Sequence, residues 1–471
     1  MEFMSNNKIN FVINPLFATF VTSLHNCQAM HKYLFFCLLF FIFLPLANAQ
    51  ELRLSRNDSK NSICFDLNQL YNYNIYEQNR WGAGLNISIP IQNNPRYGTL
   101  FQNRFEASPY FAYGTGDQAW KYGMEVALAF PRDEVKKVLL AYRHDLDKTG
   151  QHSFGKYNIF NTIENCTYFS SRYNAVNRLS CGITADIKGP AILEFEVRHS
   201  AEQMLYNAAT LLFPSRYDTD ALPRSCYNEA CLRILWGKHW IFDFSGGETH
   251  SFSHSTTDDS KLFGRMVAQY SNSYSLQKIG NVRFFAQCGA TFADGSDASL
   301  GVPLSRRFDL GGTGGSMYYF SNSLLTVRPN SFIADNYLQS SVIYSTAKPL
   351  WNIRLSKPTP FFQLNAVWGA LRTDKGLGET GTFELLSGNP IPATATVTNN
   401  EITLYAPWNG LVETVAGIDY LIHWNLFYMG FAVAYQMTPK NSLYHIDNFY
   451  DKFSVMIVAK LVFESEKDRN E

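Results

Sequence analysis

The chain has 471 residues, with 40 basic and 40 acidic residues and a formal net charge of zero, so it lacks the basic surplus of a nucleic-acid-binding protein. Only 17% of the residues are charged, whereas 15% are aromatic. This aromatic share is high for a soluble enzyme and typical of membrane barrels, which carry aromatic girdles at both interfaces. The length accommodates two or three soluble domains or one large barrel.

A secretory signal peptide is predicted at residues 30–49. A short basic segment precedes an almost wholly apolar run, and Ala47 and Ala49 frame an A-x-A cleavage site. A transmembrane anchor is the alternative, but the apolar run is shorter than the ~20 residues of a spanning helix. Residues 1–29 lie upstream of this complete signal, so we expect them to be an extension that precedes a true start at Met30.

The chain after residue 50 keeps six of the eight cysteines, at irregular spacings. Export permits disulfides, but a zinc site needs tighter cysteine pairs. Only Cys226 and Cys231 lie close together, and five residues apart on a strand they would face opposite sides. We therefore expect no metal and no cofactor.

From about residue 80 onward, apolar and polar residues alternate. Between residues 120 and 130 every second side chain is large and apolar, and those between are Lys, Gly, Glu and Ala. A helix would space its apolar residues three and four apart. The same alternation recurs at residues 85–91, 104–113, 191–198, 362–368 and 453–463. The pattern predicts β-strands with one apolar face and one small or polar face.

The strand lengths favour a membrane barrel over a soluble β-sandwich. Sandwich strands usually have about 5–6 residues, whereas these approach the ~9–11 that cross a bilayer at a tilt. In lipid the apolar face meets acyl chains, the polar face lines a lumen, and the sheet must close. We therefore predict an all-β, transmembrane antiparallel β-barrel at residues 50–463, with roughly 16 strands (about 14 to 18). A charged tail follows at residues 464–471, and the predicted location is the outer membrane.

Several motifs resemble one outer-membrane family. The clearest is PYFAYGTGD at residues 109–117, and further matching stretches lie at 120–122, 141–146, 332–339, 360–369 and 413–435. They resemble the C-terminal barrel of a family common in Bacteroidota, which joins a carboxypeptidase-regulatory-like β-sandwich to a barrel of unassigned function. That barrel is similar to the surface-antigen barrels of the BamA and TamA type. The resemblance covers most of residues 60–463, and the β-sandwich is missing from this chain.

The resemblance implies a loop that plugs the lumen, which in surface-antigen barrels carries an Arg-Gly-Tyr motif. Here FDLGGTGGS at residues 308–316 resembles the strand before that loop, but Tyr318 and Tyr319 stand where the arginine would be. Arg328 is either a substitute for that arginine or an ordinary loop residue. The candidate plug residues are Gly311, Gly312, Gly314, Gly315 and Arg328.

No motif predicts catalysis. The sequence contains no G-x-S-x-G elbow, no P-loop and no H-E-x-x-H. A barrel phospholipase would need a serine and a histidine within hydrogen-bond reach. The candidates cluster in a segment that we interpret as a polar loop: His250, Ser251, His254 and Asp258. We expect the protein not to be an enzyme, with a barrel hydrolase as an alternative.

Charged residues of both signs occupy the polar face of the predicted strands. They are Arg104, Glu106, Lys121, Glu125, Arg143, Asp145, Glu194, Glu196 and Arg198. Mixed signs on adjacent strands favour a paired structural network; a selectivity lining or a plug-docking site is the functional alternative. We expect an occluded lumen with a structural, transport or surface-assembly role, and a diffusion porin is the competing hypothesis. The expected partners are outer-membrane lipid, the barrel-assembly machinery and a periplasmic protein.

Overall fold

The computed structural model describes residues 9–10, 51–53, 62–66, 69–74, 77–91, 103–131, 133–148, 173–187, 189–204, 224–251, 261–293, 302, 306–310, 312, 319, 323–327, 331–353, 355–373, 376–384, 396–398, 401–424, 427–437 and 452–461. Within these ranges the chain is all β and contains no α-helix. No helix in this part of the chain is long and apolar enough to cross a membrane.

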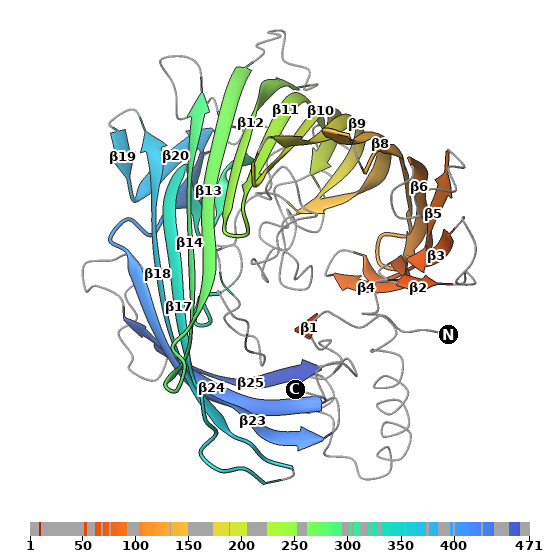
Figure 1. Cartoon of the computed structure of the whole chain (residues 1–471). Helices are drawn as coiled ribbons and strands as arrows, with labels where there is room; N and C mark the ends of the chain where they lie inside the picture. The colour runs from red at the N-terminus through yellow and green to blue at the C-terminus, as the bar shows by residue number, and fades with distance from the viewer. Residues whose placement is uncertain are drawn as a thin grey trace, which may run out of the picture.

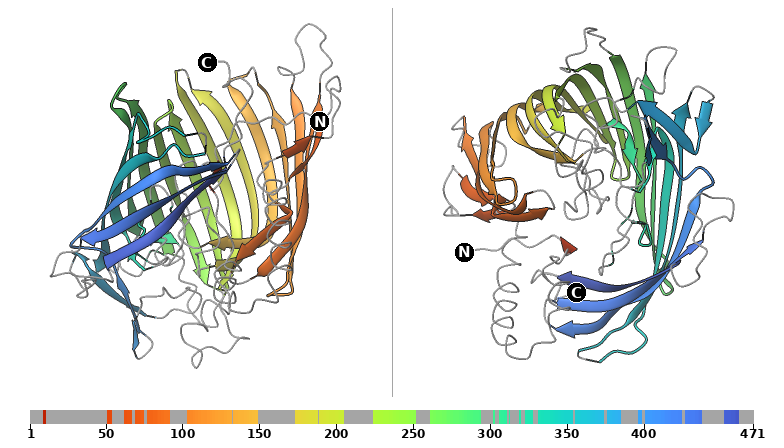
Figure 2. Two further views of the ribbon diagram at one scale, coloured as in Figure 1. Left: turned by 90° about the horizontal axis from the view of Figure 1, so that it is seen from below. Right: turned by 180° about the vertical axis from the view of Figure 1, so that it is seen from behind.

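Fifteen long strands form one curved antiparallel wall (Figure 1). They are β5 (Gln78–Pro90), β6 (Arg104–Gly114), β7 (Trp120–Ala129), β8 (Val135–Lys148), β9 (Tyr173–Ile187), β10 (Ala191–Met204), β11 (Arg224–Trp236), β12 (Trp240–Ser251), β13 (Lys261–Ser275), β14 (Gly280–Ala293), β17 (Asn336–Thr346), β18 (Thr359–Thr373), β23 (Leu411–Trp424), β24 (Phe427–Met437) and β25 (Phe453–Leu461). Each pairs with its neighbour in chain order, and Figure 2 shows them side by side in a single wall.

The shorter strands complete the wall or lie beside it. They are β1 (Ile9–Asn10), β2 (Glu51–Arg53), β3 (Ser62–Asp66), β4 (Tyr71–Asn74), β15 (Phe308–Asp309), β16 (Ile333–Ala334), β19 (Gly376–Gly378), β20 (Thr380–Glu384), β21 (Thr396–Thr398) and β22 (Glu401–Tyr405). β3 and β4 pair with the two halves of β5 and so form one interrupted strand position. With that position the wall has sixteen, which confirms the predicted all-β antiparallel architecture and strand number. Among the described residues, β25 pairs with β24 and β1 rather than with β3.

The predicted alternation sets the two faces of the wall. On β7, Trp120, Tyr122 and Met124 are exposed on the outer face, whereas Lys121 between them is 3% exposed on the inner face. Because successive side chains of a strand point to opposite sides, every second residue points into the lumen, and on these strands that residue is small or polar. The outer face of the described wall is therefore predominantly apolar.

Aromatic side chains gather on the outer face at two levels. At one end of the wall the ring centroids of Tyr113 and Trp120 are 5.1 Å apart, and Tyr122 lies beside Tyr142. At the other end Trp240 lies 4.7 Å from Tyr270. These two levels are separated by aliphatic residues, as in the girdles that bracket the apolar band of membrane barrels.

The two ends of the wall differ in the lengths of their connections. At one end, here the short-turn end, few residues join β9 to β10, β11 to β12 and β13 to β14. At the other, the long-loop end, the intervals between β8 and β9, β10 and β11, and β18 and β23 are much longer. The interval between β14 and β17 also starts at the long-loop end.

The apolar core lies inside the curve of the wall. It is built around residues 302–335, which we call the lumen segment and which connect β14 to β17. Within it β15 and β16 form a two-residue ladder. The main buried cluster combines wall and segment side chains: Val267, Phe308, Leu310, Leu324, Val327, Phe332, Ile333, Ala334, Tyr337, Val367, Leu371, Leu404, Ala406 and Leu411. The described residues of the β14–β17 connection are thus packed against the inner face of the wall.

Candidate functional site: an arginine-anchored segment in the lumen

Arg306 anchors the lumen segment to the wall. Its Nε donates to Glu229 Oε1 (2.9 Å), and its Nη2 donates to Glu202 Oε1 (2.7 Å) and to Glu229 Oε2 (2.9 Å). Nη1 donates to Glu202 Oε2 (3.1 Å), and the guanidinium carbon lies 4.2 Å above the Tyr227 ring. The planar guanidinium thus binds carboxylates of both β10 and β11, a geometry that a lysine cannot reproduce.

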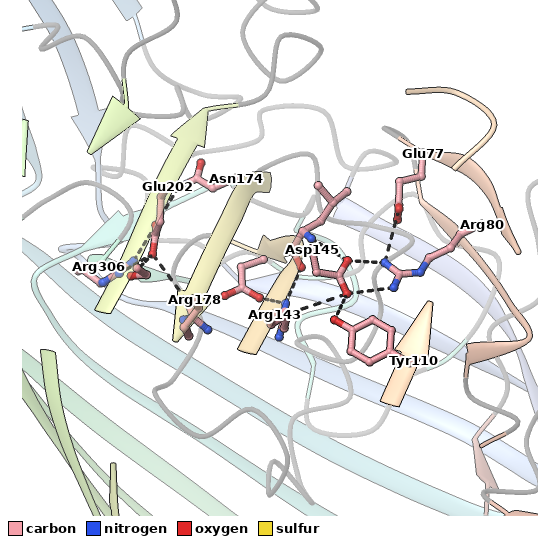
Figure 3. Close-up of polar contacts among 12 residues, drawn as sticks. Glu77, Arg80, Tyr110, Arg143, Asp145, Asn174, Arg178, Glu202 and Arg306 are labelled. Atoms are coloured by element: carbon pink, nitrogen blue, oxygen red, sulfur yellow. Dashed lines mark hydrogen bonds and ion pairs between the residues drawn. The ribbon is translucent and has the colours of Figure 1, made fainter. Parts of the chain in front are cut away.

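Arg306 completes a belt of ion pairs that crosses β5 to β11 on the inner face (Figure 3). The belt's acids are Glu77, Asp117, Asp145, Asp147, Glu202 and Glu229, and its bases are Arg80, Lys121, Arg143, Arg178, Arg198 and Arg306. Without Arg306, six carboxylates would face five cations. Buried charges are tolerated when they are paired, so the wall has one acid in excess for the segment's arginine.

Inside the belt, Asp145 is the most heavily hydrogen-bonded carboxylate at the β5 to β8 side. Arg80 donates to both of its oxygens (2.5 and 3.0 Å), and the Tyr110 hydroxyl donates to Oδ2 (2.8 Å). Arg143 pairs with Asp147, which Arg178 approaches at 2.6 Å. Residues from β5, β6, β8 and β9 are therefore tied together near the long-loop end.

A second attachment surrounds Arg307 and Phe308. Arg307 Nη1 donates to Asp335 Oδ2 (3.0 Å), and Asp335 also accepts hydrogen bonds from Thr291 on β14 and from the Arg372 amide on β18. Phe308 packs on Tyr337 with ring centroids 4.6 Å apart. These contacts hold the start and the end of the lumen segment to the same three strands.

The Phe308 ring also lies under a wall arginine, since the guanidinium carbon of Arg265 on β13 is 4.5 Å from its centroid. On the neighbouring strand β14, Gly289 makes room for two rings: an added Cβ would overlap Tyr337 Cε1 on β17 and lie 2.7 Å from Phe308 Cζ. A glycine at this inward position of β14 is therefore required by the close packing of Tyr337 and Phe308.

Glu413 on β23 forms a third attachment. Its carboxylate accepts hydrogen bonds from the amides of Leu325 (2.9 Å) and Thr326 (2.7 Å) and from the Thr326 hydroxyl (2.6 Å). Asn365 on β18 donates to the same carboxylate (3.0 Å) and to the Ser323 carbonyl (2.7 Å). One buried side chain thus satisfies backbone donors that would otherwise be unpaired inside the lumen.

The segment also reaches the last strand. The Tyr319 amide donates to the Ile457 carbonyl on β25 (2.9 Å), and the Tyr319 hydroxyl donates to Gln363 on β18. Its ring packs on Phe361 at 5.0 Å. Arg306 and Tyr319 of the segment thus contact the wall at separate places, Arg306 at β10 and β11 and Tyr319 at β25.

Electrostatics distinguish the two neighbouring arginines. Burial by itself would lower the pKa of Arg306, but the carboxylates of Glu202 and Glu229 raise it well above its ordinary value. Burial lowers the pKa of Arg307. The charge of Arg372 adds to this effect, and the carboxylate of Asp335 opposes it without cancelling it. Arg306 is thus the more strongly held cation.

The charged residues predicted from the sequence fall into two groups on the inner face. Lys121, Arg143, Asp145 and Arg198 belong to the belt near the long-loop end. Nearer the short-turn end, Lys137 forms ion pairs with Glu106 (3.5 Å) and Glu125 (2.8 Å), and Arg104 donates a hydrogen bond to Ser88. Glu194 is buried and Glu196 half-buried on β10.

The predicted plug residues are only partly within the described ranges. Gly311, Gly314, Gly315 and Arg328 lie outside them, as do Ala47 and Ala49 of the predicted signal. Gly312 is buried, and an added Cβ would lie 2.6 Å from the Val327 carbonyl oxygen. The arginine that reaches the wall acids is Arg306, before the glycine run, whereas the sequence directed attention to positions after it.

Sequence reasoning also missed Glu202, Glu229 and Glu413. The signal was available for the first of these, since Glu202 has the same alternation phase as Arg198 on β10. The adjacent pair of arginines before Phe308 was a further signal. Neither pattern indicates which distant carboxylate an arginine meets.

Of the residues considered for catalysis, His250 and Ser251 lie at the end of strand β12 rather than in a loop. His254 and Asp258 lie outside the described residues. Within the described ranges no three His, Cys, Asp or Glu side chains gather as a metal site requires.

No family model and no curated protein sequence matches the chain. Similar solved structures include CdiB from Acinetobacter baumannii, with 10% identity, a TM-score of 0.37, and coverage of 81% of this chain and 57% of that chain. BamA from Haemophilus ducreyi lacking POTRA domains 1–3 has 9% identity, a TM-score of 0.42, and coverage of 87% and 74%. OccK10 (OpdN) from Pseudomonas aeruginosa has 9% identity, a TM-score of 0.28, and coverage of 86% and 97%. The chain thus spans little more than half of the CdiB chain, and the Bacteroidota family stays a prediction.

Proposed function

We propose that the chain is an outer-membrane β-barrel of the surface-antigen-like type, with an occluded lumen and a role in transport or surface assembly rather than catalysis. Support for the membrane setting comes from the outer face, where large apolar side chains such as Phe111, Leu140 and Phe362 are exposed on strand after strand. A soluble monomer rarely exposes so extensive an apolar surface.

The observation that carries the proposal is the attachment of the lumen segment around the inner wall. It is held on β10 and β11 through Arg306, on β13 through Phe308, on β23 through Leu325 and on β25 through Tyr319. A segment bound on opposite sides of the lumen obstructs free diffusion. The arrangement therefore favours an occluded barrel over a diffusion porin.

The connection lengths give the orientation. Membrane barrels have short periplasmic turns and longer extracellular loops, so the long-loop end with its ion-pair belt faces outward. The short-turn end faces the periplasm, where the expected assembly machinery and a periplasmic partner protein would act. A hydrolase lacks a supporting observation in the described residues.

Single-channel conductance of the folded chain in a planar bilayer tests the proposal. We expect silence or rare brief openings from the wild type, and larger steps from the pair Arg306→Ala with Glu413→Ala, because two attachments of the lumen segment are lost. A folding check by heat-modifiable gel mobility accompanies each protein. Steady, large ohmic steps from the folded wild type would identify a porin and reject the occluded barrel.

A further inference from the structure

The connection between β17 and β18, residues 347–358, forms an ordered hairpin at the short-turn end, which we call the rim finger. The Leu350 amide donates to the Pro358 carbonyl (2.8 Å), and Ile353 and Ser356 exchange backbone hydrogen bonds (2.9 and 3.0 Å). Trp351 Nε1 donates to the Ser356 hydroxyl oxygen (3.0 Å). The finger is therefore internally fixed and includes a tethered tryptophan.

The finger is also attached to its neighbours on both sides. The Ala347 amide donates to the carbonyl of Ile279 in the β13–β14 turn (3.0 Å). The Lys357 amide donates to the Tyr420 carbonyl on β23 (3.0 Å), and the Ser356 hydroxyl donates to the Leu421 carbonyl (2.7 Å). The turn and the finger thus form one continuous sector of the rim.

This sector exposes large apolar side chains that nothing in the described chain covers. Exposed fractions are 59% for Leu350, 45% for Trp351, 61% for Ile353 and 58% for Leu355, and Ile279 in the adjoining turn is 65% exposed. Such a cluster on an ordered hairpin indicates a surface that is covered in the working protein.

The charges of the sector are of one sign. Lys278, Lys348 and Lys357 are exposed and form no ion pair with any described residue. The acid of this part of β23, Asp419, is buried and accepts a hydrogen bond from the Tyr420 amide. Farther round the same rim, beside the β9–β10 turn, the charges are different, because Lys136 there pairs with Asp186 at 3.0 Å.

The position of the finger indicates what covers it. In Figure 1 the finger is the teal hairpin below β23 and β24, and it lies outside the curve of the wall rather than across the lumen opening. The view from behind in Figure 2 agrees. A surface on the outer circumference of a membrane barrel faces the lipid leaflet, whereas a periplasmic protein approaches along the barrel axis.

We propose that the rim finger and the β13–β14 turn insert into the headgroup layer of the periplasmic leaflet and bind anionic phospholipid. Tryptophan is suited to this layer because its ring is apolar and its N–H is polar. Aliphatic side chains enter the acyl boundary while lysine ammonium groups reach the phosphates. The inference rests on the proposed membrane setting and adds a lipid class and the residues that bind it.

The depth of Trp351 is the first test. Tryptophan emission spectra are recorded for the wild type and for Trp351→Phe, both as full chains in nanodiscs. Subtracting the variant spectrum from the wild-type spectrum isolates the emission of Trp351. We expect blue-shifted emission that is quenched by phospholipids brominated near the glycerol end of the acyl chain. The matched control is the difference for Trp81→Phe, an outward tryptophan at the long-loop end. Water-like, unquenched Trp351 emission beside a quenched Trp81 would reject the lipid contact, while both unquenched would reject the membrane setting.

The charge preference is the second test. Phosphatidylglycerol enrichment around the folded protein, measured by lipid co-purification from mixed phosphatidylglycerol and phosphatidylcholine nanodiscs, should fall at least about fivefold in Lys278→Gln/Lys348→Gln/Lys357→Gln. Lys136→Gln, farther round the same rim beside the β9–β10 turn, should leave it unchanged. Unchanged enrichment in the triple variant would overturn the anionic preference. Enrichment lost equally in both variants would overturn the assignment to this sector.

Discussion

Replacing Arg306 by alanine removes the only cation that the described lumen segment contributes to the ion-pair belt. The substitution deletes four hydrogen bonds to Glu202 and Glu229, both almost fully buried. Arg198 remains at 2.9 Å from Glu229, but Arg178 lies 3.7 Å from Glu202. One buried carboxylate is therefore left without a close cation.

The expected loss in free energy of unfolding is about 3–5 kcal/mol, the usual effect of removing one partner from a buried ion pair. Removing the carboxylate that loses its close cation should recover most of it. The double variant Glu202→Gln/Arg306→Met keeps the volumes, leaves Glu229 paired with Arg198 and restores five acids to five cations in the described belt. We expect its unfolding free energy to lie within about 1.5 kcal/mol of the wild type.

Urea unfolding of the folded chain in lipid vesicles, followed by tryptophan emission and gel mobility, measures both values. The single variant should be the least stable of the three proteins, and its channel openings should be the most frequent. An Arg306→Ala variant within about 0.5 kcal/mol of the wild type would refute the anchoring argument, since only exposed substitutions are normally that small. A double variant less stable than the single one would show that Glu202 matters for another reason.

Three further substitutions test other parts of the structure. Glu413→Ala should speed hydrogen exchange at the Leu325 amide and increase channel openings, with Glu413→Gln intermediate; unchanged exchange would contradict the proposed attachment. Gly289→Ala should destabilise the barrel by about 1–3 kcal/mol because its Cβ would overlap the rings of Tyr337 and Phe308, whereas the outward Gly246→Ala, whose nearest contact is 3.4 Å, should be tolerated; equal effects would argue against tight packing. Leu140→Arg, at a 54% exposed outward position, should cost about 2–4 kcal/mol in a bilayer; a neutral effect would indicate that this face is in water.

Much of the wall could be predicted because strand alternation is a local property. Lys121 and Tyr122 are adjacent in a strand and therefore face opposite sides, whatever the rest of the chain does. The alternation of such residues is enough to predict one polar and one apolar face. The stretch at residues 413–435, given above as a match to the family barrel, forms the hairpin of β23 and β24, because short turns join strands that are neighbours in sequence. The strand number followed from chain length and the distance a strand must cross.

The lumen segment could not be placed in this way. Arg306 meets carboxylates 77 and 104 residues away, and only the register of β10 against β11 puts those two side chains together. The family resemblance implied a plug loop, but its candidate arginine, Arg328, was not distinguished from an ordinary loop residue. Pairing inside a barrel depends on the path of the connection through the lumen, which no local pattern encodes.

The sequence by itself thus determined the strands, their two faces and the antiparallel order of the wall, since each follows from the period of two and from turn residues. Only the tertiary structure decided which interior charges meet, how Glu413 binds the segment backbone and where the rim finger lies. Those features arise between residues far apart in the chain, where curvature and register set the distances.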